Sequence, residues 1–181
     1  MEDLQVMAVG MKKVLIRCDA SLLIGSGHVI RCRNLARVLK EQGAEVNFLC
    51  RKQSGNLINL LENEFSVLEL PEQSLLECKG LEGRKLYEAW LGCSQEKDAD
   101  DCLKALANAE ITMTDWLIVD HYGIDTRWEK ILLNALTNEK STPHLLAIDD
   151  LADRKHQADI LLDANFFGDE TEGRYQKLVP N

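Results

Sequence analysis

The sequence predicts an α/β fold, a Rossmann-like doubly wound parallel sheet, and two observations carry this prediction. Short runs of Val, Ile and Leu recur along the 181 residues with little polar alternation, which is typical of strands buried on both faces of a parallel sheet. Segments with helical spacing separate these runs, and such alternation favours parallel strands joined by crossover helices. The length accommodates one domain of good size or two very small ones.

Six apolar runs are the expected strands. They are Val14–Arg17, Val46–Cys50, Val67–Leu70, Trp116–Val119, Leu145–Ile148 and Ile160–Leu162. Ligands of open α/β sheets bind beyond the carboxyl ends of the strands, so the residues that follow these runs are the first places to look for a site.

Four segments between the runs are the expected helices: Val29–Gln42, Gly55–Glu64, Lys97–Ala109 and Asp125–Leu136. In the first of them the spacing i, i+3, i+4, i+7 of an apolar helix face is met by Cys32, Leu35, Ala36 and Leu39. Gly43 then provides a stop, and Asp125 and Thr126 are candidate caps for the last helix. Residues 71–96 are less regular and fit a long active-site loop with a short helix.

Composition excludes several classes of protein. With 45% hydrophobic residues the chain is not disordered throughout. The formal charge is −9, the pI is near 5.0 and no tract of Lys or Arg is present, which argues against binding nucleic acid or an anionic membrane. No apolar run approaches the roughly 18 residues that span a bilayer. A small anionic ligand, which needs only a local positive pocket, stays compatible with this composition.

The cysteines and the first ten residues indicate a cytoplasmic protein. Six cysteines occur without any CxxC pair, and MEDLQVMAVG lacks the basic start and long apolar core of a signal peptide. We therefore expect reduced thiols, without disulfides or a zinc knuckle.

One complete domain is expected. Residues 1–10 are predicted to be a disordered extension or a misassigned start, because Met11 offers a second start directly before the first strand. Residues 11–181 form the predicted Rossmann-like domain. Its last residues, Tyr175–Asn181, are interpreted as a linker toward a second domain that this chain does not include.

The strongest local signal is the glycine loop Ile24–Arg31, between the first strand and the first helix. Glycine permits positive φ and close approach of a ligand, and a helix N-terminus attracts anions. We therefore predict substrate contacts at Gly25, Ser26 and Gly27. Ile30 stands where a dinucleotide fingerprint has its third glycine, and no Gly-Lys-Ser/Thr of a Walker A loop is present.

His28 follows this loop directly and is the candidate general base. A helix N-terminus disfavours the imidazolium, so we expect its pKa to be shifted toward the neutral form that accepts a proton. A capping or loop histidine without chemistry is the alternative interpretation.

Three charged residues near the loop are candidate substrate contacts. Arg17 and Asp19, at the end of the first strand, are expected to point into the same crevice, or else to form a structural ion pair that fixes the loop. Arg31, one turn into the helix, is placed to reach a phosphate or to pair with an acid.

Polar residues also follow the later strands. Asp120, His121 and Tyr122 follow the fourth strand and are predicted to face the same edge as the glycine loop. Asp149-Asp150 ends the fifth strand, with Asp153, Arg154 and His156 after it, and Asp163-Ala164-Asn165 ends the sixth. These acids and histidines raise the possibility of a metal site, but the histidines lack the spacing of a zinc helix, so we predict no metal and no cofactor. We take Asp153 and His156 as solvated turn or cap residues, and Trp90-Leu91-Gly92 as a core anchor in preference to a wall for a sugar or base.

Four segments together resemble one enzyme family: IRCDASLLIGSGHVIRCRNLA, WLGCSQEKDA, LIVDHYGIDTRWE and AIDDLADRKHQADILLDAN. The chain from about Met11 to Asn181 is similar to the N-terminal domain of the UDP-2,4-diacetamido-2,4,6-trideoxy-β-L-altropyranose hydrolases of pseudaminic acid biosynthesis. The glycine–His–x–x–Arg loop combined with the DHYG strand end is more specific than either motif alone.

This resemblance implies a two-domain glycosyltransferase-B-like fold, related to the enzyme that adds N-acetylglucosamine to lipid II. It implies that water attacks the anomeric carbon with inversion, without a required metal, and releases UDP and the free diacetamido sugar for pseudaminic acid and flagellin glycosylation. His28 is the implied base and Tyr122 is implied to lie in the substrate pocket. The resemblance also implies a second domain that supplies most uridine and diphosphate contacts, and we expect this chain not to include it.

Two other functions stay open on the sequence alone. The first is that of a binding remnant, which holds a nucleotide-sugar without turning it over. The second is that of a transferase of the same fold, which passes the sugar to an acceptor. UDP release without an acceptor distinguishes hydrolysis from both.

Overall fold

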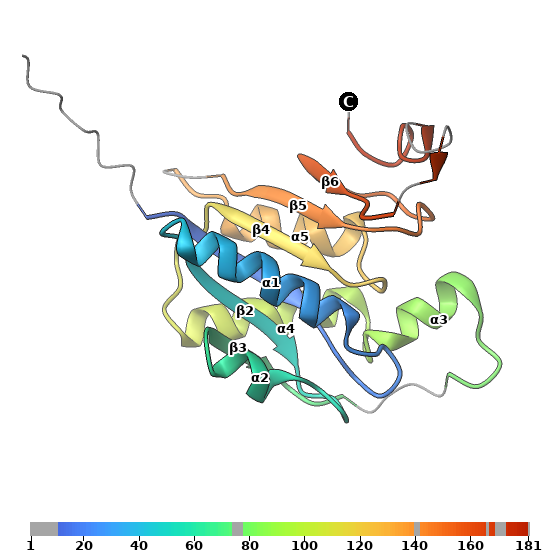
Figure 1. Ribbon diagram of the computed structural model, residues 1–181, viewed down its shortest axis with the longest axis horizontal. Helices are drawn as coiled ribbons and strands as arrows, with labels where there is room; N and C mark the ends of the chain where they lie inside the picture. Colours follow the sequence, from blue (N-terminus) through green and yellow to red (C-terminus); the bar gives the residue numbers. More distant parts are fainter. Residues whose placement is uncertain (1–10, 74–77, 140–141, 166, 169–172, 181) are drawn as a thin grey trace, which may run out of the picture.

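The computed structural model of the chain describes residues 11–73, 78–139, 142–165, 167–168 and 173–180, and in them the predicted α/β fold is confirmed (Figure 1). A six-stranded sheet has the order β3-β2-β1-β4-β5-β6, and every pairing in it is parallel. Its strands are β1 (Lys13–Cys18), β2 (Glu45–Arg51), β3 (Ser66–Leu70), β4 (Trp116–Asp120), β5 (His144–Ile148) and β6 (Ile160–Leu162).

Helices lie on both faces of this sheet. On one face lie α1 (Gly27–Glu41) and α2 (Ile58–Glu62), and on the other lie α4 (Gln95–Asn108) and α5 (Thr126–Leu136) (Figure 1). The short α3 (Gly83–Trp90) lies apart from both layers, beside the carboxyl ends of the strands (Figure 1). None of the helices in the described ranges is long and apolar enough to cross a membrane.

Side-chain alternation along β1 divides the core in two. Val14 and Ile16 join the cluster beneath α1 and α2, whereas Leu15 joins the cluster beneath α4 and α5. Because successive side chains of a strand point to opposite faces, Arg17 shares the α4 side with Leu15. The first strand therefore presents an arginine to the layer of α4, and this residue needs charged partners there.

Most predicted elements end within two residues of their observed limits, and α2 is the exception. The segment expected to be helical from Gly55 begins its helix only at Ile58. Gly55 has φ +80°, and a Cβ atom there would lie 2.9 Å from the Leu22 side chain, so the residues before the helix form a tight turn against Leu22, two residues before the glycine loop. The Asn56 side chain accepts a hydrogen bond from the Ile58 backbone N–H and starts the helix.

A candidate active site at the carboxyl edge of the sheet

The glycine loop leaves the start of α1 uncovered. Gly25 has φ +80° and its N–H donates to the Ser21 carbonyl at 2.8 Å, which closes the loop after β1. Gly25, Ser26 and Gly27 are exposed, and a Cβ atom at either glycine would meet no atom within 4 Å. The predicted anion-binding residues thus border open space at a helix N-terminus.

His28 lies at the edge of this space, in the first turn of α1. Its Nδ1 lies 2.5 Å from Oδ1 of Asp120, the last residue of β4. Arg31 Nη2 also lies 3.2 Å from this Nδ1. Because an ionised carboxylate only accepts hydrogen bonds, the much shorter contact with Asp120 favours the ring proton on Nδ1 and the lone pair on Nε2. The side chain keeps 6% of its surface exposed, and Nε2 is not among the buried nitrogens without a partner in the described residues. His28 therefore offers an accessible proton acceptor.

Asp120 is fully buried and holds three side chains of α1. Besides His28, it accepts hydrogen bonds from Arg31 Nε at 2.5 Å, from Arg31 Nη2 at 2.6 Å and from Cys32 Sγ at 3.4 Å. Burial alone would raise the pKa of Asp120, but the hydrogen bonds from Arg31 and His28 hold it below its ordinary value. Arg31 thus pairs with an acid, the second of its two predicted roles.

Tyr122 forms the other wall of the site. Its ring packs edge-on against His28 with 4.5 Å between centroids, and its hydroxyl donates to Asp150 at 2.6 Å. Burial and the Asp150 carboxylate raise the Tyr122 pKa well above its usual value, so the phenol keeps its proton. Tyr87 and Trp90 of α3 pack against Tyr122 at 5.4 and 6.3 Å. Of the segment predicted to be a core anchor, Leu91 is buried in the cluster beneath α4 and α5, whereas Trp90 is half-buried in this aromatic group and belongs to neither core cluster.

Arg17 and Asp19 lie below the site and do not reach the crevice. Both side chains are fully buried, and Arg17 pairs with Asp19 at 2.6 Å and with Asp98 of α4 at 2.8 Å. Arg51 joins Asp98 at 2.6 Å, and the two arginines hold the Asp98 pKa far below its usual value against the effect of burial. This arrangement favours the structural ion pair over a ligand contact.

His121 is likewise withdrawn from solvent. It is 1% exposed, its Nδ1 accepts the Gly123 N–H at 2.9 Å, and its Nε2 lies 3.6 Å from Asp19. Burial lowers the pKa of His121 to about 3, so the ring is neutral. Of the residues after β4, the structure brings Asp120 and Tyr122 into contact with His28, and it stacks the buried His121 ring with 6.3 Å between its centroid and that of His28.

The cluster after β5 is a buried network in this structure. His156 is 4% exposed, with Nδ1 2.6 Å from Glu129 Oε1, so its interpretation as a solvated residue is wrong, whereas Asp153 is exposed as predicted. Arg154 pairs with Asp149 at 2.6 Å. Within the described ranges, no group of three or more His, Cys, Asp or Glu side chains is arranged to hold a metal ion.

Three buried acids, Asp98, Asp101 and Glu129, are not predicted by the sequence analysis. Asp98 and Glu129 lie on helices, yet they share the buried face with Cys102 and Leu132 respectively. An acid within an apolar stripe was the available signal, since a buried carboxylate needs a charged or hydrogen-bonding partner. The sequence alone does not name those partners, because they lie 81 and 27 positions away in the chain.

The fold and the site together define a Rossmann-like α/β domain that carries an accessible histidine–carboxylate pair at the carboxyl edge of its sheet. Comparison with curated proteins confirms the resemblance predicted from the sequence. Over 168 residues, 93% of this chain, it is 32% identical to the UDP-2,4-diacetamido-2,4,6-trideoxy-β-L-altropyranose hydrolase of Campylobacter jejuni subsp. jejuni serotype O:2. The match covers 46% of that relative, so the chain spans about half of its length. No protein-family model matches the chain.

Proposed function

We propose that this chain is the catalytic-base half of a UDP-sugar hydrolase that releases UDP and 2,4-diacetamido-2,4,6-trideoxy-L-altrose. The observation that carries the proposal is the contact of 2.5 Å between His28 Nδ1 and Asp120, which leaves Nε2 accessible. The reaction and the substrate come from the name of the relative with which the chain shares 32% identity. Cytoplasmic location and the place in pseudaminic acid synthesis belong to the same proposal.

In this mechanism His28 Nε2 removes a proton from water as the water oxygen bonds to the anomeric carbon. The bond from that carbon to the diphosphate oxygen breaks, and UDP leaves with the electron pair. Water enters on the face opposite UDP, so the configuration inverts. The imidazolium that forms is stabilised by the buried Asp120 carboxylate, as in other histidine–carboxylate pairs.

The surrounding groups have separate parts in this proposal. The exposed backbone of Gly25–Gly27 at the start of α1 would receive the diphosphate. Arg31 is held by Asp120 through Nε and Nη2, and its Nη1 group, which makes no contact with Asp120, is the part placed to balance phosphate charge. Tyr122, as a protonated phenol, is placed to border the sugar beside His28. A second, glycosyltransferase-B-like domain would supply the uridine contacts and exclude bulk water.

A binding module without turnover is the second candidate function. The chain spans only 46% of its relative, and an open cleft holds a nucleotide weakly and leaves the attacking water unshielded. UDP release without any acceptor separates this candidate from the hydrolase.

The experiment is a UDP-release assay on the UDP-linked diacetamido sugar, with His28→Ala as the control, while ligand binding is followed by calorimetry. Release that disappears in His28→Ala supports the hydrolase. Binding without release by the wild-type chain supports the binding module. Release that persists in His28→Ala contradicts the role of His28.

A further inference from the structure

The short helix α3 brings two further aromatic side chains to the candidate active site. Tyr87 and Trp90 lie three positions apart on α3 and so share one side of it, with 5.1 Å between their ring centroids. Both rings pack against Tyr122, at 5.4 and 6.3 Å respectively. Tyr122 in turn packs edge-on against His28 at 4.5 Å. The rings of α3 therefore continue the group that contains the proposed base, with Tyr122 as the link.

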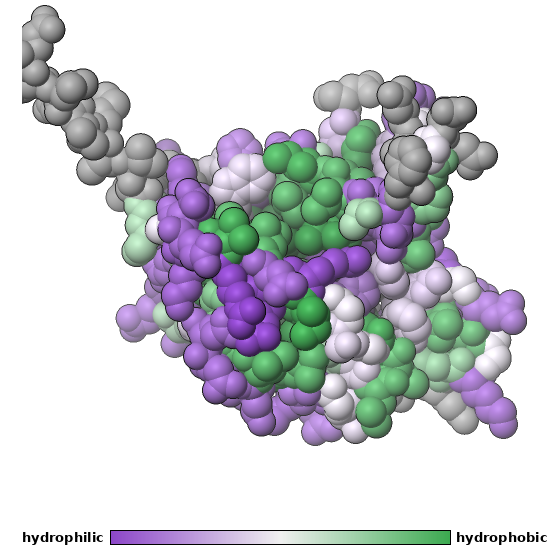
Figure 2. All heavy atoms as spheres, in the orientation of Figure 1, coloured by the Kyte–Doolittle hydropathy of each residue, from purple (hydrophilic) through white to green (hydrophobic). Residues whose placement is uncertain are grey.

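Packing in the core does not explain the two rings of α3. Of the residues of this helix, Ala89 is buried, and neither Tyr87 nor Trp90 belongs to a core cluster. Both are partly exposed, as is Tyr122. Figure 2 shows pale and green residues, of intermediate and apolar hydropathy, among the hydrophilic residues over α3. Aromatic side chains that border a site and stay partly exposed are typical of the walls of ligand pockets.

The backbone of α3, and not its aromatic side chains, fixes the helix against the ends of two strands. Gln53, which follows β2, donates from Nε2 to the Trp90 carbonyl at 3.1 Å. A Cβ atom at Gly123, after β4, would lie 2.8 Å from the Tyr87 carbonyl oxygen, so this glycine allows the helix to approach closely. Because both contacts are made by carbonyl groups, a substitution of either ring should leave α3 in place.

The sugar of the proposed substrate carries the apolar groups that such rings bind. In a 2,4-diacetamido-2,4,6-trideoxy sugar, acetamido groups replace two hydroxyls, and a methyl group replaces the hydroxymethyl group. The sugar therefore presents three methyl groups in addition to the C–H bonds of its ring. Such groups bind aromatic faces, because contact removes apolar surface from water and because the ring face carries partial negative charge.

We propose that Tyr87 and Trp90 form, together with Tyr122, an aromatic wall that binds the sugar and selects for its methyl-bearing substituents. Because the identity of the sugar comes from the proposed function, this wall rests on that function. Among the ring contacts of the described residues, His28 packs against Tyr122 and not against the rings of α3. The rings of α3 would therefore contact substituents remote from the anomeric carbon, where they affect binding and selectivity and not proton transfer.

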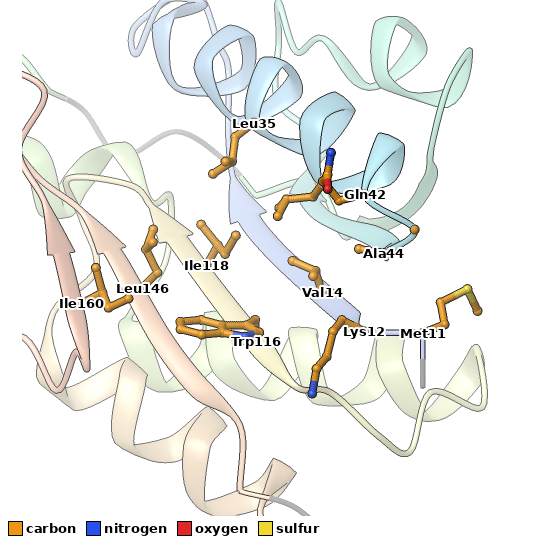
Figure 3. A pocket seen from close by; sticks show the side chains of 12 residues that line it. Met11, Lys12, Val14, Leu35, Gln42, Ala44, Trp116, Ile118, Leu146 and Ile160 are labelled. Atoms are coloured by element: carbon orange, nitrogen blue, oxygen red, sulfur yellow. The ribbon is translucent and has the colours of Figure 1, made fainter. Parts of the chain in front are cut away.

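A second tryptophan, at the other end of β4, provides a matched control. Trp116 is the first residue of this strand, whereas Tyr122 follows its last residue. Trp116 is partly exposed and packs against His144 at 5.0 Å. It lines an apolar groove of about 400 Å³ between α1 and the sheet, away from His28 (Figure 3). Trp116→Leu and Trp90→Leu thus remove the same ring from two separate places.

Saturation-transfer NMR with the free 2,4-diacetamido-2,4,6-trideoxyaltrose measures sugar binding without turnover, and circular dichroism confirms that each variant is folded. Irradiation of the aromatic protons of the protein should transfer saturation to the methyl protons of the sugar. We expect Trp90→Leu and Tyr87→Leu each to raise the dissociation constant about three- to tenfold, the effect of one lost aromatic contact. Trp90→Phe, which keeps a ring, and Trp116→Leu should stay within about twofold of wild type.

Selectivity is the second measurement, with N-acetylglucosamine as the competing sugar. It has one acetamido group and a hydroxymethyl group, so we expect the wild-type chain to bind it about tenfold or more weakly, and Trp90→Leu to reduce this preference. A merely structural role of Trp90 would weaken the binding of both sugars equally.

UDP release is measured separately and decides the proposed function alone. Sugar binding that depends on Trp90 but not on Trp116 supports the wall even if no UDP is released. Equal dissociation constants for Trp90→Leu and Trp116→Leu overturn the wall even if UDP is released. A wild-type chain that does not bind the diacetamido sugar, or a preference between the two sugars that Trp90→Leu leaves unchanged, overturns it as well.

Discussion

Two histidine–carboxylate pairs in this domain have nearly the same geometry and opposite surroundings. His28 Nδ1 lies 2.5 Å from Asp120, and His156 Nδ1 lies 2.6 Å from Glu129, with both carboxylates fully buried. The Nε2 atom of His156 is buried without a hydrogen-bond partner among the described residues, whereas that of His28 is not sealed in this way. A histidine–carboxylate pair alone therefore does not identify a general base, and the accessibility of Nε2 distinguishes His28 from His156.

The local backbone creates this difference. His28 follows two glycines whose missing side chains leave open space before α1. The pair formed by His156 instead ties two parts of the chain together, because Glu129 also accepts the Gln157 N–H at 2.6 Å and the His156 N–H donates to the Leu178 carbonyl at 2.7 Å. The arrangement at His28 leaves a ring nitrogen facing open space, and the arrangement at His156 connects separate segments of the chain.

Replacing His28 and His156 in turn by glutamine should produce the largest difference between the two pairs. We expect His28→Gln to lower kcat/KM for UDP release by about 10²–10⁴, the usual contribution of a general base. His156→Gln should leave kcat/KM within about threefold and lower the melting temperature instead. Kinetics and thermal unfolding of both variants check this, and equal kinetic losses at the two positions would remove the distinction.

Asp120→Asn tests whether the carboxylate orients the base. An amide can donate to Nδ1 and shift the ring proton to Nε2, so we expect kcat/KM to fall about 100-fold or more. Nitrogen-15 NMR of the imidazole reports the tautomer directly and does not require turnover. Unchanged His28 nitrogen shifts in Asp120→Asn would show that the carboxylate does not set the tautomer.

Glu129→Gln should affect stability and spare catalysis. The change removes the charged partner of a buried histidine, and we expect the free energy of unfolding to fall by about 1–3 kcal/mol. Urea unfolding measures this loss, with Glu139→Gln, a change outside the network, as the control. A fall in UDP release without a loss of stability would indicate that Glu129 and His156 belong to the active site.

His121 should make the fold sensitive to acid. Its pKa is lowered to about 3 in the folded chain, whereas an unfolded histidine titrates near pH 6.5. Unfolding therefore takes up a proton at acidic pH, so this stabilisation is complete above about pH 6.5 and is lost as the pH falls toward 3. Between pH 6.5 and 5 the loss should be about 2 kcal/mol. Urea unfolding of wild type and His121→Gln measures it, and equal pH slopes would contradict the assignment.

Tyr122→Phe should have the smallest effect. The ring contact with His28 is kept and the hydroxyl that donates to Asp150 is lost. We expect kcat/KM to fall about tenfold, equivalent to about 1.4 kcal/mol of transition-state stabilisation. Steady-state kinetics measures this, and a loss as large as that of His28→Gln would give the hydroxyl a direct part in the chemistry.

Sequence reasoning succeeded where the signal was local. Continuous apolar runs located all six strands, and the spacing from Cys32 to Leu39 located α1. Topology then implied that Asp120 and His28 meet at one edge, although it did not pair them. The prediction failed where distant residues decide the outcome: the burial of His156 depends on Glu129, and that of Arg17 depends on Asp98. Packing against residues that are distant in the sequence decides whether a polar residue after a strand is exposed to solvent. The residue's neighbours in the sequence do not reveal this packing.

The most direct test of the central claim is nitrogen-15 NMR of the four histidines, with and without UDP and the UDP-linked diacetamido sugar. We predict that His28 carries its proton on Nδ1 and that its Nε2 signal shifts when ligand is added, while the His156 signals stay unchanged. A His28 ring that is protonated on Nε2, or that does not respond while His156 does, would contradict the assignment of His28 as the accessible base.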